Sequence, residues 1–514
     1  MGERPAGLPR LLPFALAAML LASECRADWR VVPGIALTER YTDNFYQERN
    51  DLKRSQFISE LTPSLMLTKT GPRLALNGTA EWRNFHYRDD ALRETLDHSF
   101  QYALSGRGTL AEDFLYVDAS ASATPRDIPA FGPLIEDAPY LADNLAKIET
   151  WRISPYLERR FGQAASLSVR YARDGVKGGN VRGYADSVSD NLTTTLSSGP
   201  AYGKLGWSLM HRRQDLKDSI SGETASESAA LSLRYALTTR VGLTASAGYD
   251  RYEFDGPGAD NAGRNWSLGF DWTPSQRTRM SASLGRHFYG QTGSFSLLHR
   301  SRRTVWNLSY SDGVSTARDR FLLPAALDTA ALLDRLFSST ITDPALRQQA
   351  VAAYIASNGL PPSLSESVNF LSNRYFRQKD LQGSMAFKLA RTSGLLSLSS
   401  SDRIALSSQQ SDSGLLGSQL SSHNDNVRQH GADARVNYRL SPRSSAVASA
   451  SWSRSHSLTT DIVDIRRDFR VGLTHQLGRK LYAAVDLNRR FGTFGRGAGP
   501  FHEHSISASL SVQL

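Results

Sequence analysis

The last eleven residues, His504-Ser-Ile-Ser-Ala-Ser-Leu-Ser-Val-Gln-Leu514, alternate between polar and apolar side chains without a break. Successive side chains of a β-strand point to opposite faces, so this strand would have one apolar face and one polar face. A helix would scatter both kinds of side chain around its circumference. The stretch therefore predicts a strand between an apolar and an aqueous medium. Such a strand belongs either to a soluble β-sandwich or to a membrane barrel with lipid outside and water inside.

Segments of the same kind recur from about Trp29 to the end of the chain, with no linker or charge block between them. In Arg264–Trp272, Asp468–Leu477 and Leu481–Arg490, one face carries large apolar side chains and the other carries mostly polar side chains or glycine. The mean hydropathy of −0.37 excludes a bundle of membrane-spanning helices. It does not exclude a barrel, because only every second strand residue of a barrel meets lipid.

The connections between these segments are alternately short and long. Outer-membrane barrels have this rhythm, with tight periplasmic turns and longer extracellular loops. Counting back from the C-terminus gives about 22 strands, or about 20 if the short connection near Gly290 is not a hairpin. A soluble sandwich lacks this rhythm and seldom has strands of roughly eleven or more residues. We therefore expect an all-β fold, in which residues 28–514 form a transmembrane antiparallel β-barrel in the outer membrane of a Gram-negative bacterium.

Residues 1–27 have the features of a signal peptide. Two arginines precede an apolar run from Leu11 to Ala22, and Cys25 and Ala27 occupy the positions that signal peptidase reads. We predict cleavage after Ala27. The alternative, a lipoprotein anchored through Cys25, would require a small residue where Glu24 stands. Cleavage removes the only cysteine, which excludes thiol catalysis and thiolate metal sites from the mature chain.

One segment departs from the strand pattern. Residues 314–376 form the longest expected extracellular loop, and within them the hydrophobic period changes to that of a helix. Asp343 and Pro344 are suited to begin a second helix, which Asn358-Gly359 would end. We expect this helical hairpin to fold into the barrel as a plug, although other loops or a partner protein could also cover its apolar stripe. The stripe consists of Leu332, Leu333, Leu336 and Phe337.

The sequence contains little that resembles a catalytic or metal site. No glycine-rich phosphate loop follows a strand, and the pair His502 and His504 lacks a third metal ligand. Serines lie on inward faces whereas His211 and His475 lie on outward ones, so no pair suits a barrel phospholipase. We expect no enzyme activity, no cofactor and no metal. The net charge of +10 is spread without a basic run, which argues against a nucleic-acid partner.

Arginines recur on the expected inward faces of the strands. They could make the lumen favour anions, or they could pair with inward acids such as Asp271 and Asp486, or with a plug. We favour pairing. The set comprises Arg170, Arg212, Arg234, Arg279, Arg435, Arg439 and Arg470.

Several short motifs carry a resemblance to a known family. Tyr41-Thr42-Asp43-Asn44 follows the first strand, Phe131-Gly132-Pro133-Leu134 lies in the third long loop, and His299-Arg300-Ser301-Arg302-Arg303-Thr304 occurs at a periplasmic turn. With the insert that ends Asn358-Gly359-Leu360-Pro361, these features resemble the PEP-CTERM-system-associated outer-membrane family, found beside exosortase and polysaccharide genes. The resemblance implies a location and a genomic setting, but no reaction. The terminal Leu514 departs from the aromatic residue that usually ends the barrel-assembly signal.

We therefore expect an outer-membrane barrel associated with an exopolysaccharide or protein-sorting system, which exports or passes polymer or solutes. The alternative is a non-conducting structural or anchoring protein of the cell surface. The expected partners are outer-membrane lipid, the barrel-assembly machinery, and polysaccharide or envelope export components.

Overall fold

The computed structural model describes residues 29–89, 95–128, 130–133, 140–141, 145–179, 183–220, 222–253, 261–322, 370–408, 412, 414–415, 421–495 and 499–513. The expected signal peptide and the apolar stripe of the helical insert lie outside these residues. The strands are β1 (Trp29–Thr42), β2 (Gln56–Lys69), β3 (Leu74–Tyr87), β4 (His98–Ala111), β5 (Leu115–Asp127), β6 (Leu145–Phe161), β7 (Ala165–Gly178), β8 (Ser187–Ser198), β9 (Leu205–Asp218), β10 (Gly222–Ala236), β11 (Val241–Tyr252), β12 (Ala262–Ser275), β13 (Thr278–His287), β14 (Gly290–Arg300), β15 (Thr304–Thr316), β16 (Tyr375–Lys388), β17 (Thr392–Ala405), β18 (Val427–Arg439), β19 (Ser444–Ser457), β20 (Val463–Gln476), β21 (Leu481–Phe494) and β22 (Gly499–Gln513). The helices are α2 (Ala317–Phe321) and the 3₁₀ turn η2 (Pro200–Tyr202).

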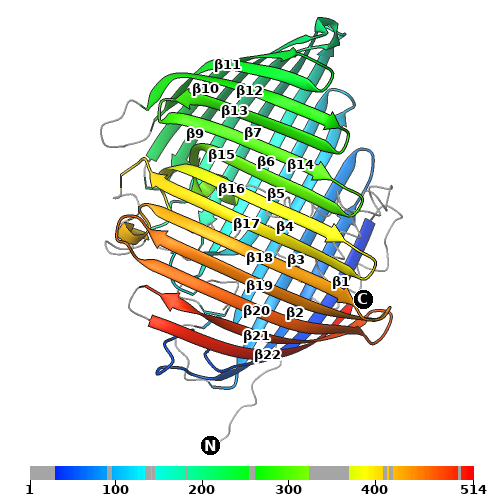
Figure 1. Ribbon diagram of the computed structural model, residues 1–514, viewed down its shortest axis with the longest axis vertical. Coiled ribbons are helices and arrows are strands. Elements are labelled where there is room, and N and C mark those ends of the chain that lie inside the picture. The colour runs from blue at the N-terminus through cyan, green and yellow to red at the C-terminus, as the bar shows by residue number, and fades with distance from the viewer. Residues whose placement is uncertain are drawn as a thin grey trace, which may run out of the picture.

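These strands form one closed antiparallel barrel. Each strand pairs with the next along the chain, and β1 also pairs with β22, so the 22-stranded sheet has no free edge (Figure 1). The β13–β14 connection near Gly290 is a hairpin, with Gly290 at φ 116° beside the turn. The expected count of 22 strands is therefore confirmed, and the alternative of about 20 is wrong.

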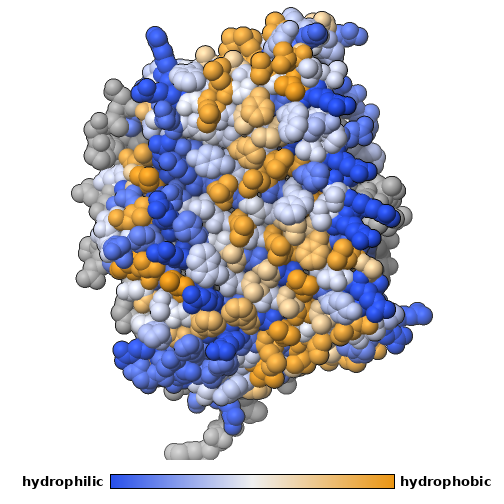
Figure 2. Space-filling view, viewed as in Figure 1, coloured by the Kyte–Doolittle hydropathy of each residue, from blue (hydrophilic) through white to orange (hydrophobic). Residues whose placement is uncertain are grey.

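The outer face of the barrel carries the large apolar side chains that the sequence places there. Leu268, Leu284 and Leu398 are 59%, 74% and 65% exposed. Figure 2 shows apolar side chains gathered over the middle of the strands, with hydrophilic ones toward both strand ends. Such a belt is the lipid-facing surface of a membrane barrel, so the protein crosses a membrane with its strands. None of the described helices is long and apolar enough to span a membrane.

The two ends of the barrel differ in their connections. At one end the strands are joined by short turns, and the C-terminus lies at this end, which we call the turn end. The longer loops gather at the other end, which we call the mouth (left in Figure 1). Among the described residues, three clusters of buried apolar side chains lie at the mouth, centred on Phe45, Phe131 and Phe321. The core of the protein is therefore a layer of loop and strand ends across the mouth.

Candidate functional site

The two described ends of the longest loop fold into the mouth. We call residues 317–322 and 370–374 the mouth strap. Its first part is the short helix α2, which begins because Thr316 accepts a hydrogen bond from the backbone N–H of Asp319 at 3.1 Å and donates to its carboxylate at 2.8 Å. Phe321 at the end of α2 packs into the cluster formed by the ends of β6 and β7, and Leu371 from the returning chain joins it. This helix was not predicted from the sequence, which placed the helical stripe from Leu332 onward.

Arginine–aspartate ion pairs hold the strap to the barrel wall. Arg318 pairs with Asp174 of β7, and its Nε donates to Ser187 Oγ at 2.8 Å. These two charged side chains are only 7% and 2% exposed. Arg320 pairs with Asp380 of β16 on a different part of the wall. The strap thus bridges wall segments that are far apart around the barrel.

The returning part of the strap is held by the β17–β18 loop. Arg374 pairs with Asp425 and also donates from Nε to the carbonyl oxygen of Ser407 at 3.0 Å. The Asp412 carboxylate accepts hydrogen bonds from Ser372 Oγ at 2.6 Å and from the backbone N–H of Asn373 at 2.7 Å. Burial raises the pKa of Asp412, and these two hydrogen bonds oppose that rise.

The β7–β8 loop interlocks with both of these segments. Asn373 donates from Nδ2 to the carbonyl oxygen of Gly183 at 2.8 Å, and its Oδ1 accepts from the backbone N–H of Ala185 at 2.9 Å. Gly183 has a φ of 82°, and a Cβ at this position would lie 2.2 Å from the carbonyl carbon of Gly414. Only glycine can therefore occupy this crossing without displacing the β17–β18 loop.

The motif Tyr41–Asn44 forms the seam at which the barrel closes. Thr42 Oγ1 donates to the Glu503 carboxylate at 2.9 Å, and Gln47 Nε2 donates to its other oxygen at 3.2 Å. Asn44 Nδ2 donates to the carbonyl oxygen of His502 at 3.0 Å. Glu503 is only 1% exposed, and Arg490 also contacts its carboxylate at 3.4 Å. A buried carboxylate with this many donors ties the first strand to the last.

Glu503 is a site residue that the sequence reasoning missed. The notable residues at this point in the sequence were His502 and His504, whose side chains lie on the other face of β22, away from Glu503. The His502 ring stacks on Phe491 with 6.0 Å between ring centroids, and the His504 backbone N–H donates to Asp43. The available signal was that Glu503 shares a strand face with the inward serines of the same strand.

The other two motifs lie at opposite ends of the barrel. Phe131 is 2% exposed in the mouth cluster, and the next residue, Gly132, donates its backbone N–H to Asp464 Oδ2 at 2.7 Å. Gly132 has a φ of 103°, which favours glycine, and its carbonyl accepts from Arg466. At the turn end, Ser301 and Thr304 close the β14–β15 turn with hydroxyl and backbone hydrogen bonds of 2.8 Å each.

Three of the inward arginines predicted from the sequence form ion pairs with carboxylates of the wall. Arg170 meets Asp118 at 2.9 Å, Arg234 meets Asp271 at 3.3 Å, and Arg470 meets Asp486 at 2.9 Å. Arg439 instead donates to the carbonyl oxygen of Ala390 at 3.2 Å. Arg279 lies on β13 and Arg435 lies on β18, whereas Arg212 lies on β9. The structure therefore distributes these residues around the lumen and does not gather them into one site.

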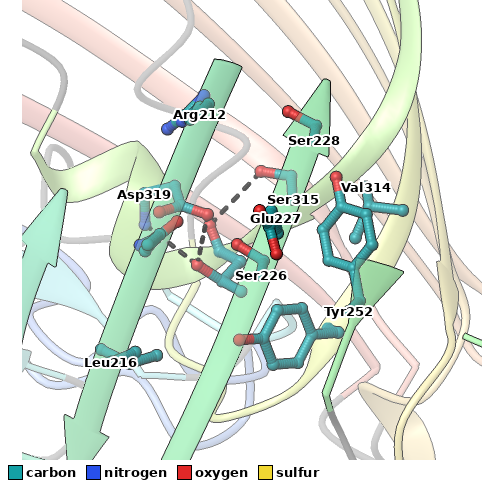
Figure 3. Close-up of a pocket in the computed structure, with 12 residues that line it drawn as sticks. Arg212, Leu216, Ser226, Glu227, Ser228, Tyr252, Val314, Ser315 and Asp319 are labelled. Atoms are coloured by element: carbon teal, nitrogen blue, oxygen red, sulfur yellow. Dashed lines mark hydrogen bonds between the residues drawn. The ribbon is translucent and has the colours of Figure 1, made fainter. Parts of the chain in front are cut away.

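Arg212 lies in a cavity between the mouth strap and the wall (Figure 3). Near the mouth, Arg377 of β16 pairs with Asp312 of β15 at 2.8 Å and also donates to the carbonyl oxygen of Tyr289 in the β13–β14 connection. The Tyr375 hydroxyl lies 3.4 Å from Thr224 Oγ1 of β10. The cavity has a volume of about 110 Å³. Its lining comprises Arg212, Gln214, Leu216, Ser226, Glu227, Ser228, Tyr252, Val314, Ser315, Thr316, Asp319 and Tyr375.

No family model and no curated protein matches the chain. Among solved structures it is similar to the siderophore receptor PirA from Pseudomonas aeruginosa, with 10% identity over 95% of this chain and 81% of the receptor, and a TM-score of 0.43. It is also similar to the FrpB iron transporter from Neisseria meningitidis, with 10% identity over 97% of this chain and 83% of the transporter, and a TM-score of 0.48. With TM-scores below 0.5, these likenesses carry no argument about what this chain binds.

Proposed function

We propose that the protein is a gated passage for a polar polymer or solute across the outer membrane of a Gram-negative bacterium. The observation that carries this proposal is the mouth strap, whose arginines are paired with carboxylates of three different barrel elements. A closure made of separate ion pairs can be released without unfolding the strands, because each strand keeps both of its neighbours. Gating by loop segments that have two arrangements is a common conformational device.

The lumen wall supports a hydrated and uncharged cargo. Several of its arginines pair with carboxylates of the wall, as in the pairs of Arg170 on β7 with Asp118 on β5 and of Arg470 on β20 with Asp486 on β21. Between these pairs, β17 and β19 present rows of inward serines, which include Ser399 and Ser453 on either side of Gly431. Hydroxyl groups both donate and accept hydrogen bonds, so such a wall suits a ligand that is itself rich in hydroxyls. We therefore expect weak ion selectivity.

We further propose that the cargo belongs to an exopolysaccharide or PEP-CTERM sorting system. Two of the motifs that carry this resemblance, Tyr41–Asn44 and Phe131–Leu134, have their described residues in the contacts of the mouth. Deletion of the gene in its host should then reduce surface polysaccharide without reducing other outer-membrane proteins. Unchanged surface polysaccharide would contradict the assignment to that system.

The gated-passage proposal can be tested by conductance in planar lipid bilayers. The variant Asp174→Asn removes the charge that pairs with Arg318, and we expect it to open more often than the parent. Asp271→Asn is the matched control, because it breaks a wall pair that does not involve the strap. An Asp174→Asn barrel that inserts correctly but stays closed would contradict gating by the strap.

The second candidate function is a non-conducting anchor at the cell surface. The observation that favours it is the extent of burial at the mouth, where Phe45 and Leu371 are both 0% exposed. An anchor would hold polymer or a partner protein on its loops and would never open. This alternative would be supported if neither the parent protein nor the strap variants conduct in lipid bilayers.

A further inference from the structure

The cavity beside the mouth strap is lined by groups that complement a hydroxyl-rich ligand. The Arg212 guanidinium can only donate hydrogen bonds and the Asp319 carboxylate can only accept them, whereas the hydroxyls of Ser226, Ser228 and Ser315 can do both. Figure 3 shows these side chains, which come from β9, β10, β15 and α2, around one space. A sugar hydroxyl likewise donates and accepts, so neighbouring hydroxyls of one ring can satisfy both kinds of partner.

The balance of charge in the cavity argues against a strongly charged ligand. Arg212 forms no ion pair with any of the described residues, so its charge is available to a ligand. Asp319 places a negative charge in the same cavity, although Thr316 donates one hydrogen bond to it. The Glu227 carboxylate is turned to His211 at 2.8 Å. A net anion would be attracted by Arg212 but repelled by Asp319, and a net cation would meet the opposite conflict.

Two tyrosines complete the cavity. Tyr252 from β11 and Tyr375 from β16 each combine an apolar ring with a hydroxyl, which suits a ligand with both C–H and O–H groups. The Tyr375 hydroxyl already lies 3.4 Å from Thr224 Oγ1, so Tyr375 connects the start of β16 to β10. A ligand bound here would touch the strap and the wall at once.

From this geometry we infer that the cavity binds neutral sugar units of a saccharide chain at the mouth of the barrel. The inference rests on the proposed passage function, which it deepens by naming the ligand class. Arg212, Asp319 and the serines would hold the ring hydroxyls, and the tyrosines would contact its apolar face. Because the cavity is bounded by α2, occupancy would be sensed by the same element that carries Arg318.

The test is titration calorimetry on the purified full-length barrel in detergent micelles. The probes are neutral hexasaccharides of glucose, mannose or galactose, and a hexagalacturonate as the charged probe of equal length. We expect at least one neutral probe to bind about tenfold more tightly than the uronate. Tighter binding of the uronate, or no binding of any neutral probe, would overturn the inference.

Two substitutions locate the binding. Arg212→Gln and Ser228→Ala should each weaken binding of the neutral probe. For Arg212→Gln we expect an affinity about tenfold lower, because a charged hydrogen-bond donor is lost. Ser232→Ala is the matched control, since Ser232 lies on the same inward face of β10 but outside the cavity lining. Heat-modifiable migration on gels checks that each variant is folded. Equal effects of Ser228→Ala and Ser232→Ala would place the sugar elsewhere and would overturn the inference.

The failure of this inference can be separated from that of the proposed function. Conductance in bilayers without binding of any neutral probe would overturn the sugar site and leave the passage standing. Binding that is lost in Arg212→Gln, in a barrel that never conducts, would support the sugar site and point to the anchoring alternative.

Discussion

The mouth and the turn end of this barrel are made from the same strands but are stabilised in different ways. At the turn end, short turns such as that between Ser301 and Thr304 are closed by hydrogen bonds between residues close in sequence. At the mouth, the pair Arg318–Asp174 joins residues 144 positions apart, and the seam bond from Thr42 to Glu503 spans 461 positions. The wall therefore depends mainly on contacts between adjacent strands and on the media at its two faces, whereas the mouth depends on interactions between distant segments. Substitutions at the two ends should therefore have different consequences.

The largest contrast is expected for ion pairs inside and outside the mouth core. Asp174→Ala would leave Arg318 buried without its partner, which costs about 3–5 kcal/mol in buried pairs. Asp51→Ala breaks the pair with Arg49, whose side chains are 57% and 49% exposed, and such a pair contributes little to stability because water and salt screen it. Limited proteolysis of the folded barrels would measure the difference. Equal protease resistance of the two variants would show that the strap is not held by this pair.

The next largest contrast separates the two faces of the wall. Ile506 faces outward at 47% exposure, and an arginine near the bilayer midplane on that face costs about 2–4 kcal/mol. Ser507, the next residue, pairs in register with Asp486 on the lumen side, where an arginine stays in contact with water. Ile506→Arg should reduce refolding into vesicles, and Ser507→Arg should be tolerated. Equal folding yields would contradict the assigned lipid face.

A third contrast uses two glycines with positive φ. A Cβ at Gly183 would meet the backbone of Gly414 at the mouth, whereas a Cβ at Gly162 on the turn end would meet nothing within 4 Å. Both alanine variants incur the left-handed backbone cost of about 1–2 kcal/mol. Only Gly183→Ala adds a steric conflict, so it should loosen the mouth and raise conductance. Gly162→Ala should leave conductance at the parental level.

The smallest expected effect is a dependence of mouth closure on pH. Burial raises the pKa of Asp412, so the closed mouth binds its proton more tightly than a released loop does. This contribution to closure is present below the ordinary aspartate pKa and is lost as the pH rises through the raised pKa. The open probability should therefore increase with pH across that window. Asp412→Asn should remove this component, and a pH dependence unchanged in that variant would assign it to another group.

Much of the wall could be predicted from the sequence, because lipid and water act on alternate residues of every strand. The 22 strands, the outward set around Leu268 and the inward arginines all follow from this period of two. The mouth could not be predicted in the same way. Helix α2 has five residues, too few to establish a helical period, and its stability comes from Phe321 packing on other strands. Glu503 was likewise concealed, because Thr42 and Gln47, which donate hydrogen bonds to it, lie at the other end of the chain.

The seam also constrains the order in which the barrel can be assembled. Thr42 and Gln47 lie near the start of the chain and Glu503 near its end, so their hydrogen bonds join residues 461 and 456 positions apart. Contacts of such long sequence separation form late, since the chain entropy of closing the loop must be lost first. Until then the Glu503 carboxylate remains hydrated, and afterwards it is inaccessible to water. Solvent protection at Glu503 would therefore mark the moment at which an open sheet becomes a closed barrel.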